Sequence, residues 1–481
     1  MDDGILTVQR TARPQDADWS TVTPAGPQVD YALVRRIRET VNRQLDEWTA
    51  ALERLPSPVE QRRRAEDFVT SWLEQQMLSS IEAGMRLLTS VEEQALRAAT
   101  LAEMFGLGRL EALLAEEDIE DIYIAGTRPV VVRLADGRRQ LREPLAATVE
   151  DLMQQLQTFA THHGQNARSV TSARPWLNLR LPGDARLAAM WDVTPVPYVT
   201  IRRHRFVDIT LDQLVSMGMV SPAMSVFLKA AVLARRSILV VGAQSSGKTT
   251  LLRALCRCIP DTERFVTIES EFELLLHELP GKFPGLMAAE EREGMGELGR
   301  DGRPAGEVTI EDLFPHTLRH SLDRCIVGEV RGGEVGAVLK AMTRGYKGSM
   351  ATFHADSAAE TVQSMASLMS EYRANWSPEA ARYQIASALD LVVFVDREMI
   401  PGRSDHRFVS HILEVNGVSE QGRVIETPIF EPLEAYDGVD PRGYLVGQPE
   451  NQKWWRRAGL DPNWLESAAS GWPEAYPSAG R

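Results

Sequence analysis

The chain has 481 residues, which is more than one compact domain usually holds, so two or three domains are expected. Its formal charge is −14, and this acidic balance argues against a protein that works mainly along a nucleic-acid backbone, because such proteins concentrate positive charge to displace counterions. Its three cysteines, Cys256, Cys258 and Cys325, have neither the pairing of a disulfide framework nor the spacing of a zinc site, which favours a reduced, cytoplasmic protein.

We expect neither a secretion signal nor a membrane-spanning segment in this sequence. The start, MDDGILTVQR, is acidic where a signal peptide needs a basic stretch followed by an apolar core. No run approaches the ~20 apolar residues that are needed to span a bilayer. We therefore expect a cytoplasmic protein that meets a membrane only through its partners.

The first hundred residues divide into a leader and a helical segment. Residues 1–29 contain Pro, Asp, Ser and Thr without a hydrophobic period, which predicts a flexible leader. Over residues 31–52 apolar side chains recur at steps of three and four, which predicts a helix, and the sequence LPSP at 55–58 ends it. Helical periodicity continues over 59–105, so residues 30–100 are predicted to form a helical N-terminal segment.

Residues 101–206 are predicted to form a smaller α+β domain. A short helix leads into the strand-like sequences DIYIAG and PVVVRLADGRR, in which Asp136 and Gly137 are a hairpin signal. A helix in VEDLMQQLQTFATHHG and strands in WLNLRLPGDARLAAMW and YVTIRRHRF complete the predicted domain.

A helical connector is predicted over 207–233, followed by a larger α/β domain over 234–436. Short apolar runs alternate there with helical stretches; they are SILVV, RFVTIE, RCIVGEV, SMATFH and LDLVVFVD, with FVSHILEV after them. This alternation predicts a largely parallel sheet covered by helices on both faces. The charged, Gly-rich stretch at 290–307 predicts a mobile loop.

Residues 437–481 form a tail rich in Pro and Gly. It contains four tryptophans, Trp454, Trp455, Trp464 and Trp472. These aromatic side chains are expected to dock either on the body of the protein or on a partner, and the sequence does not distinguish the two.

The stretch GAQSSGKTT at 242–250 satisfies the pattern G-x-x-x-x-G-K-[ST], with a predicted strand before it and a helix after it. Gly242 and Gly247 let the loop turn tightly around phosphates, and the N-terminus of the helix faces the anion. Lys248 supplies positive charge for the β and γ phosphates, and Thr249 supplies a hydroxyl for Mg²⁺. We therefore predict that ATP and Mg²⁺ bind here, in contact with Gly242, Ala243, Gln244, Ser245, Ser246, Gly247, Lys248, Thr249 and Thr250.

Three polar residues lie at the ends of three later strands. Glu269 ends RFVTIE, Glu329 lies near the end of RCIVGEV, and His354 follows SMATF. Any one of them alone would be interpreted as a helix cap or a surface charge. Because the carboxyl ends of parallel strands meet at one edge of a sheet, we expect the three to lie together beside the phosphates, with Glu329 suited to binding Mg²⁺ or orienting the attacking water.

Four ordered motifs resemble those of the bacterial secretion ATPases of the type II/type IV superfamily, and within it the CpaF/TadA-like motors of tight-adherence (Flp-type) pili. GAQSSGKTT resembles the Walker A motif, TIESEFEL the Asp box, LRHSLDRCIVGEVRGGEV the Walker B motif with its preceding arginine, and GYKGSMATFHADS the His box. GLGRLEALLAEEDIEDIYIAG and YVTIRRHRF resemble parts of the N-terminal domain of that family. The resemblance covers roughly residues 100–420.

The resemblance implies a RecA-like P-loop domain and a hexameric ring, with nucleotide held between the two domains. It implies that Glu269 is the general base, that Glu329 is the Walker B carboxylate and a metal ligand with Thr249, and that His354 senses the γ phosphate. It also implies that four arginines act on the nucleotide; they are Arg202 and Arg203 of the first domain and Arg319 and Arg331 around the Walker B motif. Ser270 departs from the family pattern, which has an acidic residue there, and Glu271 and Glu273 are candidates to compensate.

The expected function is ATP hydrolysis that powers pilus assembly or protein export at the cytoplasmic face of the membrane. The expected partners are further copies of the chain, polytopic inner-membrane platform proteins and, indirectly, a pilin or secreted substrate. Two alternatives are retained: a nucleic-acid translocase of a conjugation-like system, which the acidic balance disfavours, and a nucleotide-dependent scaffold that does not hydrolyse ATP. An ABC transporter ATPase is disfavoured because no LSGGQ-like stretch is present.

Overall fold

The structure is a computed structural model. It describes residues 20–21, 29–52, 54–163, 172, 174–181, 185–203, 206–299, 302–343, 346–372, 376–398, 405–433, 440–450, 452–459, 471–474 and 476. Most of the predicted leader and Trp464 therefore lie outside the described residues. The chain divides into two compact units, Met1–Arg205 and Phe206–Arg481, which are described separately as unit 1 and unit 2.

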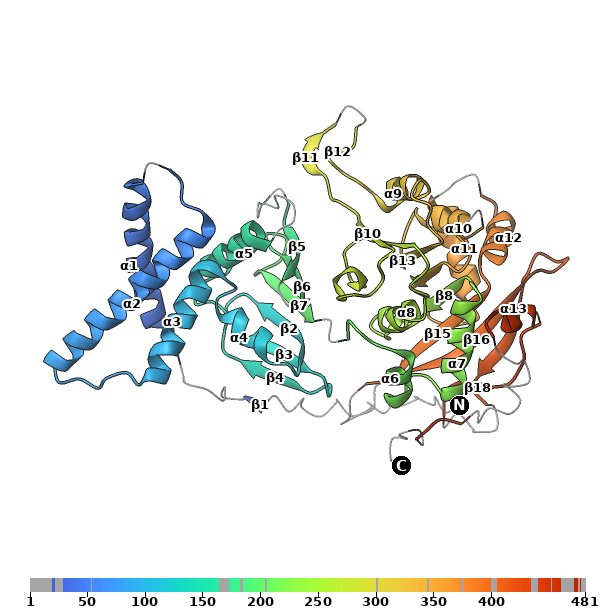
Figure 1. Ribbon diagram of the computed structural model, residues 1–481, viewed down its shortest axis with the longest axis horizontal. Coiled ribbons are helices and arrows are strands. Elements are labelled where there is room, and N and C mark those ends of the chain that lie inside the picture. Colours follow the sequence, from blue (N-terminus) through green and yellow to red (C-terminus); the bar gives the residue numbers. More distant parts are fainter. Residues whose placement is uncertain are drawn as a thin grey trace, which may run out of the picture. The chain divides into compact units, whose positions relative to one another are not determined.

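Unit 1 begins with three helices, α1 (Tyr31–Ala50), α2 (Pro58–Glu82) and α3 (Ser90–Phe105), shown in blue in Figure 1. Ser57 and Thr89 form capping boxes with Glu60 and Glu92, and each box satisfies backbone donors at a helix start. The predicted helical stretch over 59–105 is thus interrupted at 83–89. The helices pack through a small apolar core of Ile37, Val41, Ala65, Val69 and Leu73.

The rest of unit 1 is a sheet with two helices. The elements are β1 (Ser20–Thr21), α4 (Arg109–Ala115), β2 (Ile119–Ala125), β3 (Val130–Leu134), β4 (Arg139–Arg142), α5 (Val149–His163), β5 (Trp176–Leu181), β6 (Ala185–Met190) and β7 (Tyr198–Arg203). The strand order is β1-β4-β3-β2-β7-β6-β5, and all pairs except β1–β4 are antiparallel. Gly137, at φ +83°, closes the turn between β3 and β4 as its hairpin signal predicts.

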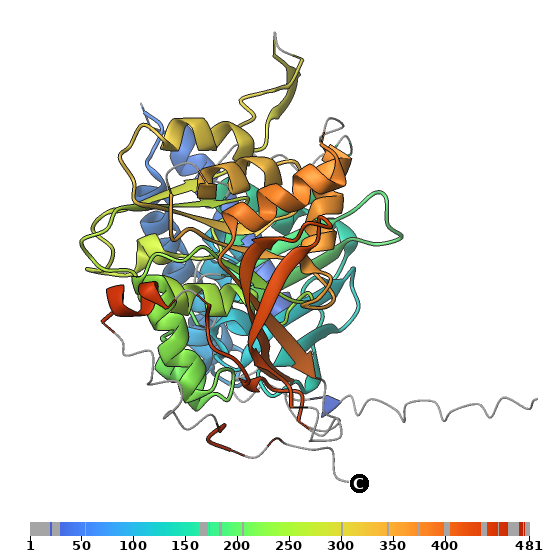
Figure 2. The ribbon, with the colours of Figure 1, turned by 90° about the vertical axis from the view of Figure 1, so that its right-hand side faces the viewer.

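Unit 2 is built on a nine-stranded sheet in the order β10-β9-β13-β14-β8-β15-β16-β17-β18. Its strands are β8 (Ile238–Val241), β9 (Phe265–Glu269), β10 (Leu286–Glu290), β13 (Arg324–Val330), β14 (Met350–Phe353), β15 (Leu391–Glu398), β16 (His406–Val418), β17 (Val424–Glu431) and β18 (Tyr444–Leu445). Strands β10 to β15 in that order are parallel, whereas β16 to β18 add an antiparallel extension (Figure 2).

Helices cover both faces of this sheet, and the α/β class predicted from the sequence is confirmed. One core contains side chains of α6 (Leu211–Ser216), α7 (Pro222–Leu233), α8 (Lys248–Cys256) and α13 (Lys453–Arg457). The other contains side chains of α9 (Ile310–Thr317), α10 (Val335–Thr343), α11 (Thr361–Tyr372) and α12 (Pro378–Ala388). A strand buried on both faces needs apolar residues at every position, which is why β8 is a continuous apolar run.

Two segments of unit 2 differ from the structure that the sequence predicts for them. Residues 207–233 are not a separate connector in this unit, because Leu214 and Phe227 are fully buried in its core. The stretch at 290–307 is not an unstructured loop: β10 ends at Glu290, and β11 (Met295–Leu298) and β12 (Pro304–Ala305) pair as an antiparallel hairpin that projects from the unit (Figure 1). Its Gly-rich composition supplies the turn, where Gly302 has φ +79°.

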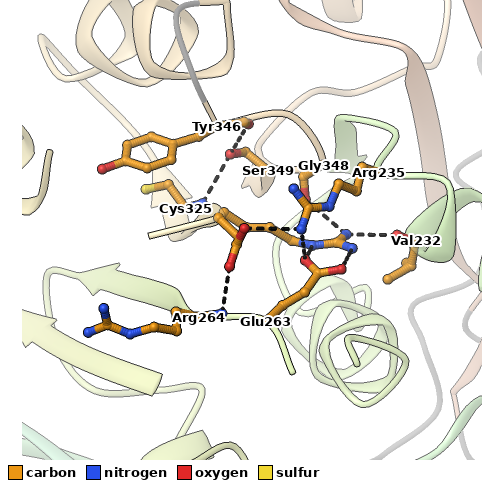
Figure 3. Close-up of polar contacts among 10 residues, drawn as sticks. Val232, Arg235, Glu263, Arg264, Cys325, Tyr346, Gly348 and Ser349 are labelled. Atoms are coloured by element: carbon orange, nitrogen blue, oxygen red, sulfur yellow. Dashed lines mark hydrogen bonds and ion pairs between the residues drawn. The ribbon is translucent and has the colours of Figure 1, made fainter. Parts of the chain in front are cut away.

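The starts of three parallel strands are tied together by a buried ionic cluster (Figure 3). Arg324, at the start of β13, is fully buried, donates to both carboxylate oxygens of Glu263 before β9, and donates to the carbonyl of Val232 at 2.8 Å. Ser349, before β14, accepts from the backbone N–H of Cys325. A buried arginine is tolerated when all its charge is matched in this way, so this cluster aligns the strands at the edge opposite the P-loop.

Part of the tail packs on unit 2. Trp454 and Trp455 on α13 are buried, stack on each other, and lie 5.7 and 5.2 Å from the ring of Phe227. Docking on the body is thus the correct alternative for these two residues. No helix in the described part of the chain is both long enough and apolar enough to span a bilayer.

Trp455→Ala is expected to lower the free energy of unfolding of unit 2 by about 3–5 kcal/mol, because it leaves a large cavity against Phe227. The measurement is urea unfolding of the full chain, followed by circular dichroism. Tyr383→Ala on α12 is the control, since that side chain is 68% exposed and its loss is expected to cost less than about 0.5 kcal/mol. Equal midpoints for the two variants would contradict the assigned packing.

Candidate active site

The loop between β8 and α8 has the backbone of a phosphate-binding loop. Gly242 has φ +149° and Gly247 has φ +106°. A Cβ at Gly242 would lie 2.1 Å from the carbonyl oxygen of Val395 and 2.8 Å from Ser246 Oγ. Any larger residue would therefore push the loop away from β15. The two motif glycines are required by conformation and, at Gly242, by space.

The side chains of Lys248 and His354 both contact the carbonyl oxygen of Gly242. Lys248 is 8% exposed, and its Nζ donates to the carbonyl oxygens of Gly242 and Ala243, both at 2.9 Å. His354 Nδ1 lies 3.1 Å from the same Gly242 oxygen. A lysine held over its own loop in this way lies where it can exchange carbonyl contacts for phosphate oxygens.

The loop also fits an anionic ligand. Ser246 is fully buried, and its Oγ has no hydrogen-bond partner among the described residues. Thr249 and Thr250 are half-buried in the first turn of α8. A helix N-terminus, a buried unpartnered hydroxyl and a lysine are together the donor set that a phosphate chain needs.

The sheet places the three predicted strand-end residues on neighbouring strands. Pairing runs from β8 to β14, from β14 to β13 and from β13 to β9, all parallel. His354 follows β14, Glu329 lies in β13, and Glu269 ends β9. Glu269 also lies against the residue before Glu329, because a Cβ on Gly328 would be 3.0 Å from Glu269 Cγ.

Glu269 is a buried carboxylate with one oxygen satisfied. Its Oε2 accepts from the backbone N–H groups of Glu273 and Leu274, at 2.9 and 2.7 Å. Its Oε1 is buried without a hydrogen-bond partner among the described residues. Burial raises the pKa of Glu269 to about 7, although the two backbone donors oppose that rise. A carboxylate with a pKa near neutrality and an open acceptor is suited to taking a proton.

Glu329 has a different environment. Its Oε2 accepts from Nε of Arg331 at 2.7 Å, and the two side chains form an ion pair. Arg331 is itself held by Glu334, which accepts from the backbone N–H of Arg331 and of Gly332. The contact with Arg331 therefore fixes the orientation of the Glu329 side chain, which suits a group that binds a cation in a set geometry.

The structure also gives the surroundings of the other three predicted arginines. Arg319 is exposed in the segment between α9 and β13. Arg202 and Arg203 belong to β7 of unit 1, where Arg202 lies 3.9 Å from Asp121 and Arg203 donates to the carbonyl of Glu116. Within unit 2, Lys248 and His354 are thus the predicted residues whose side chains contact the backbone of the loop.

Three features of the site were not predicted. Thr352 on β14 donates to the carbonyl of Gly328 at 2.6 Å, and Glu290 accepts from the N–H of Phe272. Burial and the nearby carboxylates of Glu334, Glu307 and Glu271 raise the pKa of Glu291. No short motif identifies these residues, since each acts through the fold. Ser270 is the position where the chain departs from the Asp box, and Glu273 was a candidate to compensate for it. Glu273 contacts Glu269 through its backbone N–H, which donates to the Glu269 carboxylate.

The described residues include no group of three His, Cys, Asp or Glu side chains that could hold a metal ion by themselves. Mg²⁺ in nucleotide sites keeps several waters and is shared with phosphate oxygens, so it needs only one or two protein ligands. Thr249 and Glu329 are of the right chemical type for such a site.

Residues 104–415 match the model of the family described as type II/IV secretion system protein. The chain belongs to this family. All four motifs and every candidate site residue lie within the family match, whereas helices α1 and α2 of unit 1 and the tail lie outside it. The more specific CpaF/TadA-like assignment is not part of this match.

Two bacterial relatives are matched by the chain over most of their own length. A putative conjugal transfer protein of Mycobacterium tuberculosis is 30% identical over 308 residues, covering 62% of this chain and 82% of the relative. The type IV secretion system protein PtlH homolog of Bordetella bronchiseptica is 29% identical over 318 residues, covering 61% and 90%. Among solved structures, the VirB11 ATPase of the Brucella suis type IV secretion system is 24% identical with a TM-score of 0.34, covering 67% of this chain and 96% of the other.

Proposed function

We propose that this chain hydrolyses ATP and converts the energy into mechanical work for a pilus of the Flp/Tad type or a type II/IV-like secretion system. The carrying observation is that Lys248 and His354 meet at the Gly242 carbonyl of a P-loop, while the strands bearing Glu329 and Glu269 follow side by side. Such a site has the positioning groups and charges that phosphoryl transfer needs.

The proposed roles follow from the environments of the residues. The loop N–H groups, Lys248 and Thr249 hold the phosphates. Thr249 and Glu329 would hold Mg²⁺, which when bound would offset negative charge on the transferring phosphoryl group. Glu269 takes a proton from the attacking water as the water oxygen bonds to the γ phosphorus and the bond to the β-phosphate oxygen breaks. His354, next to the loop, senses whether the γ phosphate is present.

The larger assembly is also part of the proposal. The chain acts as a hexameric ring of RecA-like domains at the cytoplasmic face of the membrane, with Arg202, Arg203, Arg319 and Arg331 contributing positive charge to nucleotide bound between domains. Polytopic inner-membrane platform proteins receive the motion and pass it to a pilin or a secreted substrate. Mass photometry with nucleotide is expected to show six copies; a monomer with full activity would contradict the ring.

DNA transfer is the second candidate, and one relative favours it by name, as a putative conjugal transfer protein. The net charge of −14 opposes it. Stimulation of ATP hydrolysis by single-stranded DNA would favour this candidate, and no response would favour protein cargo. A scaffold that binds ATP without hydrolysing it is excluded if the purified chain turns over.

Glu329→Gln tests the hydrolytic proposal. We expect phosphate release to slow about 10²-fold while fluorescent ADP still binds, because the neutral amide keeps the shape of the side chain but loses the charge that holds the cation. Glu371→Gln, an exposed position on α11, is the matched control and is expected to leave the rate unchanged. A near-normal rate in Glu329→Gln would contradict the assigned role.

A further inference from the structure

Arg407 lies beside the phosphate-binding loop, although it is about 160 residues away in the sequence. A Cβ added to Gly247, the residue that caps α8, would lie 3.6 Å from Arg407 Cδ and 3.1 Å from Met219 Cε. The aliphatic stem of Arg407 therefore reaches the last glycine of the loop. Its guanidinium begins one bond beyond Cδ with a buried Nε, so the positive group starts close to the glycine that caps the helix.

The strand that carries Arg407 is hydrogen-bonded through its backbone to the segment that contains Met219. Arg407 is in β16, and the N–H of Val409 donates to the carbonyl of Met219 at 2.8 Å. Side chains alternate along a strand, so His406 and Phe408 lie on the opposite face from Arg407. The position of Arg407 thus depends on what packs against His406 and Phe408.

That packing comes from the end of the chain. The ring of Tyr476 lies 5.5 Å from His406 and 5.9 Å from Phe408. Arg442 lies 4.7 Å from the ring of Trp472 and 5.2 Å from that of Tyr476. We call Asp440, Arg442, Trp472 and Tyr476 the C-terminal clasp.

The clasp is held together by buried hydrogen bonds and an ion pair. Arg442 is 2% exposed, forms a bidentate ion pair with Asp440 at 2.9 and 2.7 Å, and donates to the carbonyl of Glu474. Trp472 Nε1 donates to the carbonyl of Gly443 at 3.0 Å. Buried charge-assisted bonds and cation–π contacts hold one geometry well, so the clasp is able to set the position of the start of β16.

We propose that Arg407 binds the phosphate chain of the nucleotide and that the C-terminal clasp positions it there. This rests on the proposed function, because it requires nucleotide at the loop. Arginine is the side chain best suited to phosphate oxygens, since its planar fork can donate two bonds at once. The clasp then links the tail of the chain, outside the family match, to nucleotide affinity.

The first test is calorimetric binding of ADP and of inorganic pyrophosphate to the full chain. Arg407→Gln is expected to weaken both by roughly 10- to 100-fold, and Arg407→Lys by less, because a charge-assisted bond is lost in the first and partly kept in the second. Arg423→Gln, which removes an exposed charge at the far end of the same β16–β17 hairpin, is the control.

The outcomes separate two failures. If the wild-type chain binds neither ligand, the proposed function itself is wrong. If the wild type binds and Arg407→Gln binds both as tightly, or loses ADP but keeps pyrophosphate, then Arg407 does not contact the phosphates and the inference is overturned. Unchanged thermal unfolding of Arg407→Gln excludes a folding defect as the cause.

The second test concerns Tyr476 as a positioning residue. Tyr476→Ala is expected to raise the KM for ATP about threefold or more while kcat changes little, and Tyr476→Phe is expected to restore the KM because the ring contacts remain. Equal KM values for the alanine variant and the wild type would overturn the role of the clasp. A loss of kcat alone would overturn it as well.

Discussion

Lys248→Ala is expected to remove measurable ATP hydrolysis. The side chain is almost fully buried in the loop and holds the carbonyls of Gly242 and Ala243, so alanine removes both the positive charge for the phosphates and the bonds that shape the cradle. The loss of one such donor lowers catalytic rates by about 10²–10³, and weaker nucleotide binding adds to it. Steady-state phosphate release is the measurement.

Two further variants make this test specific. Lys229→Ala removes an exposed lysine from α7 of the same unit and is expected to leave the rate unchanged. Lys248→Arg is expected to fail like alanine, since a planar guanidinium does not replace a compact ammonium in a loop this tight. Substantial hydrolysis by Lys248→Ala would mean that the loop is not the site of the reaction.

Glu269→Gln is expected to abolish turnover and at the same time to stabilise the fold at high pH. As general base, Glu269 is expected to contribute about 10²–10⁴ to the rate, and the amide has no basic oxygen. In the wild type, activity should rise with pH through about 7, because burial raises the pKa of Glu269 to about 7 and only the ionised form accepts a proton.

The pH dependence of stability has the opposite sign from the pH dependence of activity. The folded pKa of about 7 lies above the ordinary value of 4.5, so the native chain holds this proton more tightly than the unfolded chain. The stabilisation is complete below pH 4.5 and is lost as pH rises through 7, up to about 3 kcal/mol. Glutamine never ionises, so the variant should gain stability relative to wild type between pH 5 and pH 8.

Urea unfolding at the two pH values checks this prediction, with the exposed Glu371→Gln as control. The stability difference between Glu269→Gln and wild type should be larger at pH 8 than at pH 5, and the control should show no such change. A constant difference would show that burial does not raise the pKa of Glu269, and wild-type turnover in Glu269→Gln would show that Glu269 is not the base.

Much of unit 2 was predictable because its signals are local. A strand buried on both faces must be apolar throughout, so β8, β9, β13 and β14 appear in the sequence as short apolar runs. A phosphate loop needs glycine where a Cβ would collide, so the loop is written into the chain as GAQSSGKTT.

The hairpin at 290–307 and the packing of the tail were not predictable in the same way. Glycine and charged residues occur both in irregular loops and in hairpin turns, so composition alone does not distinguish the two. The sequence around Trp454 and Trp455 has no pattern that predicts what they pack against. In the folded chain they are buried against Phe227 of α7.

The sequence by itself determined the α/β class, the phosphate loop and the residues that end the strands, because each depends on the chemistry of a few consecutive positions. The tertiary structure decided which of these groups meet. The sharing of the Gly242 carbonyl by Lys248 and His354, the raised pKa of Glu269 and the place of Arg407 beside Gly247 all arise between segments far apart in the chain. Burial and contact are properties of the folded sheet, and strand order, which no local pattern encodes, sets both.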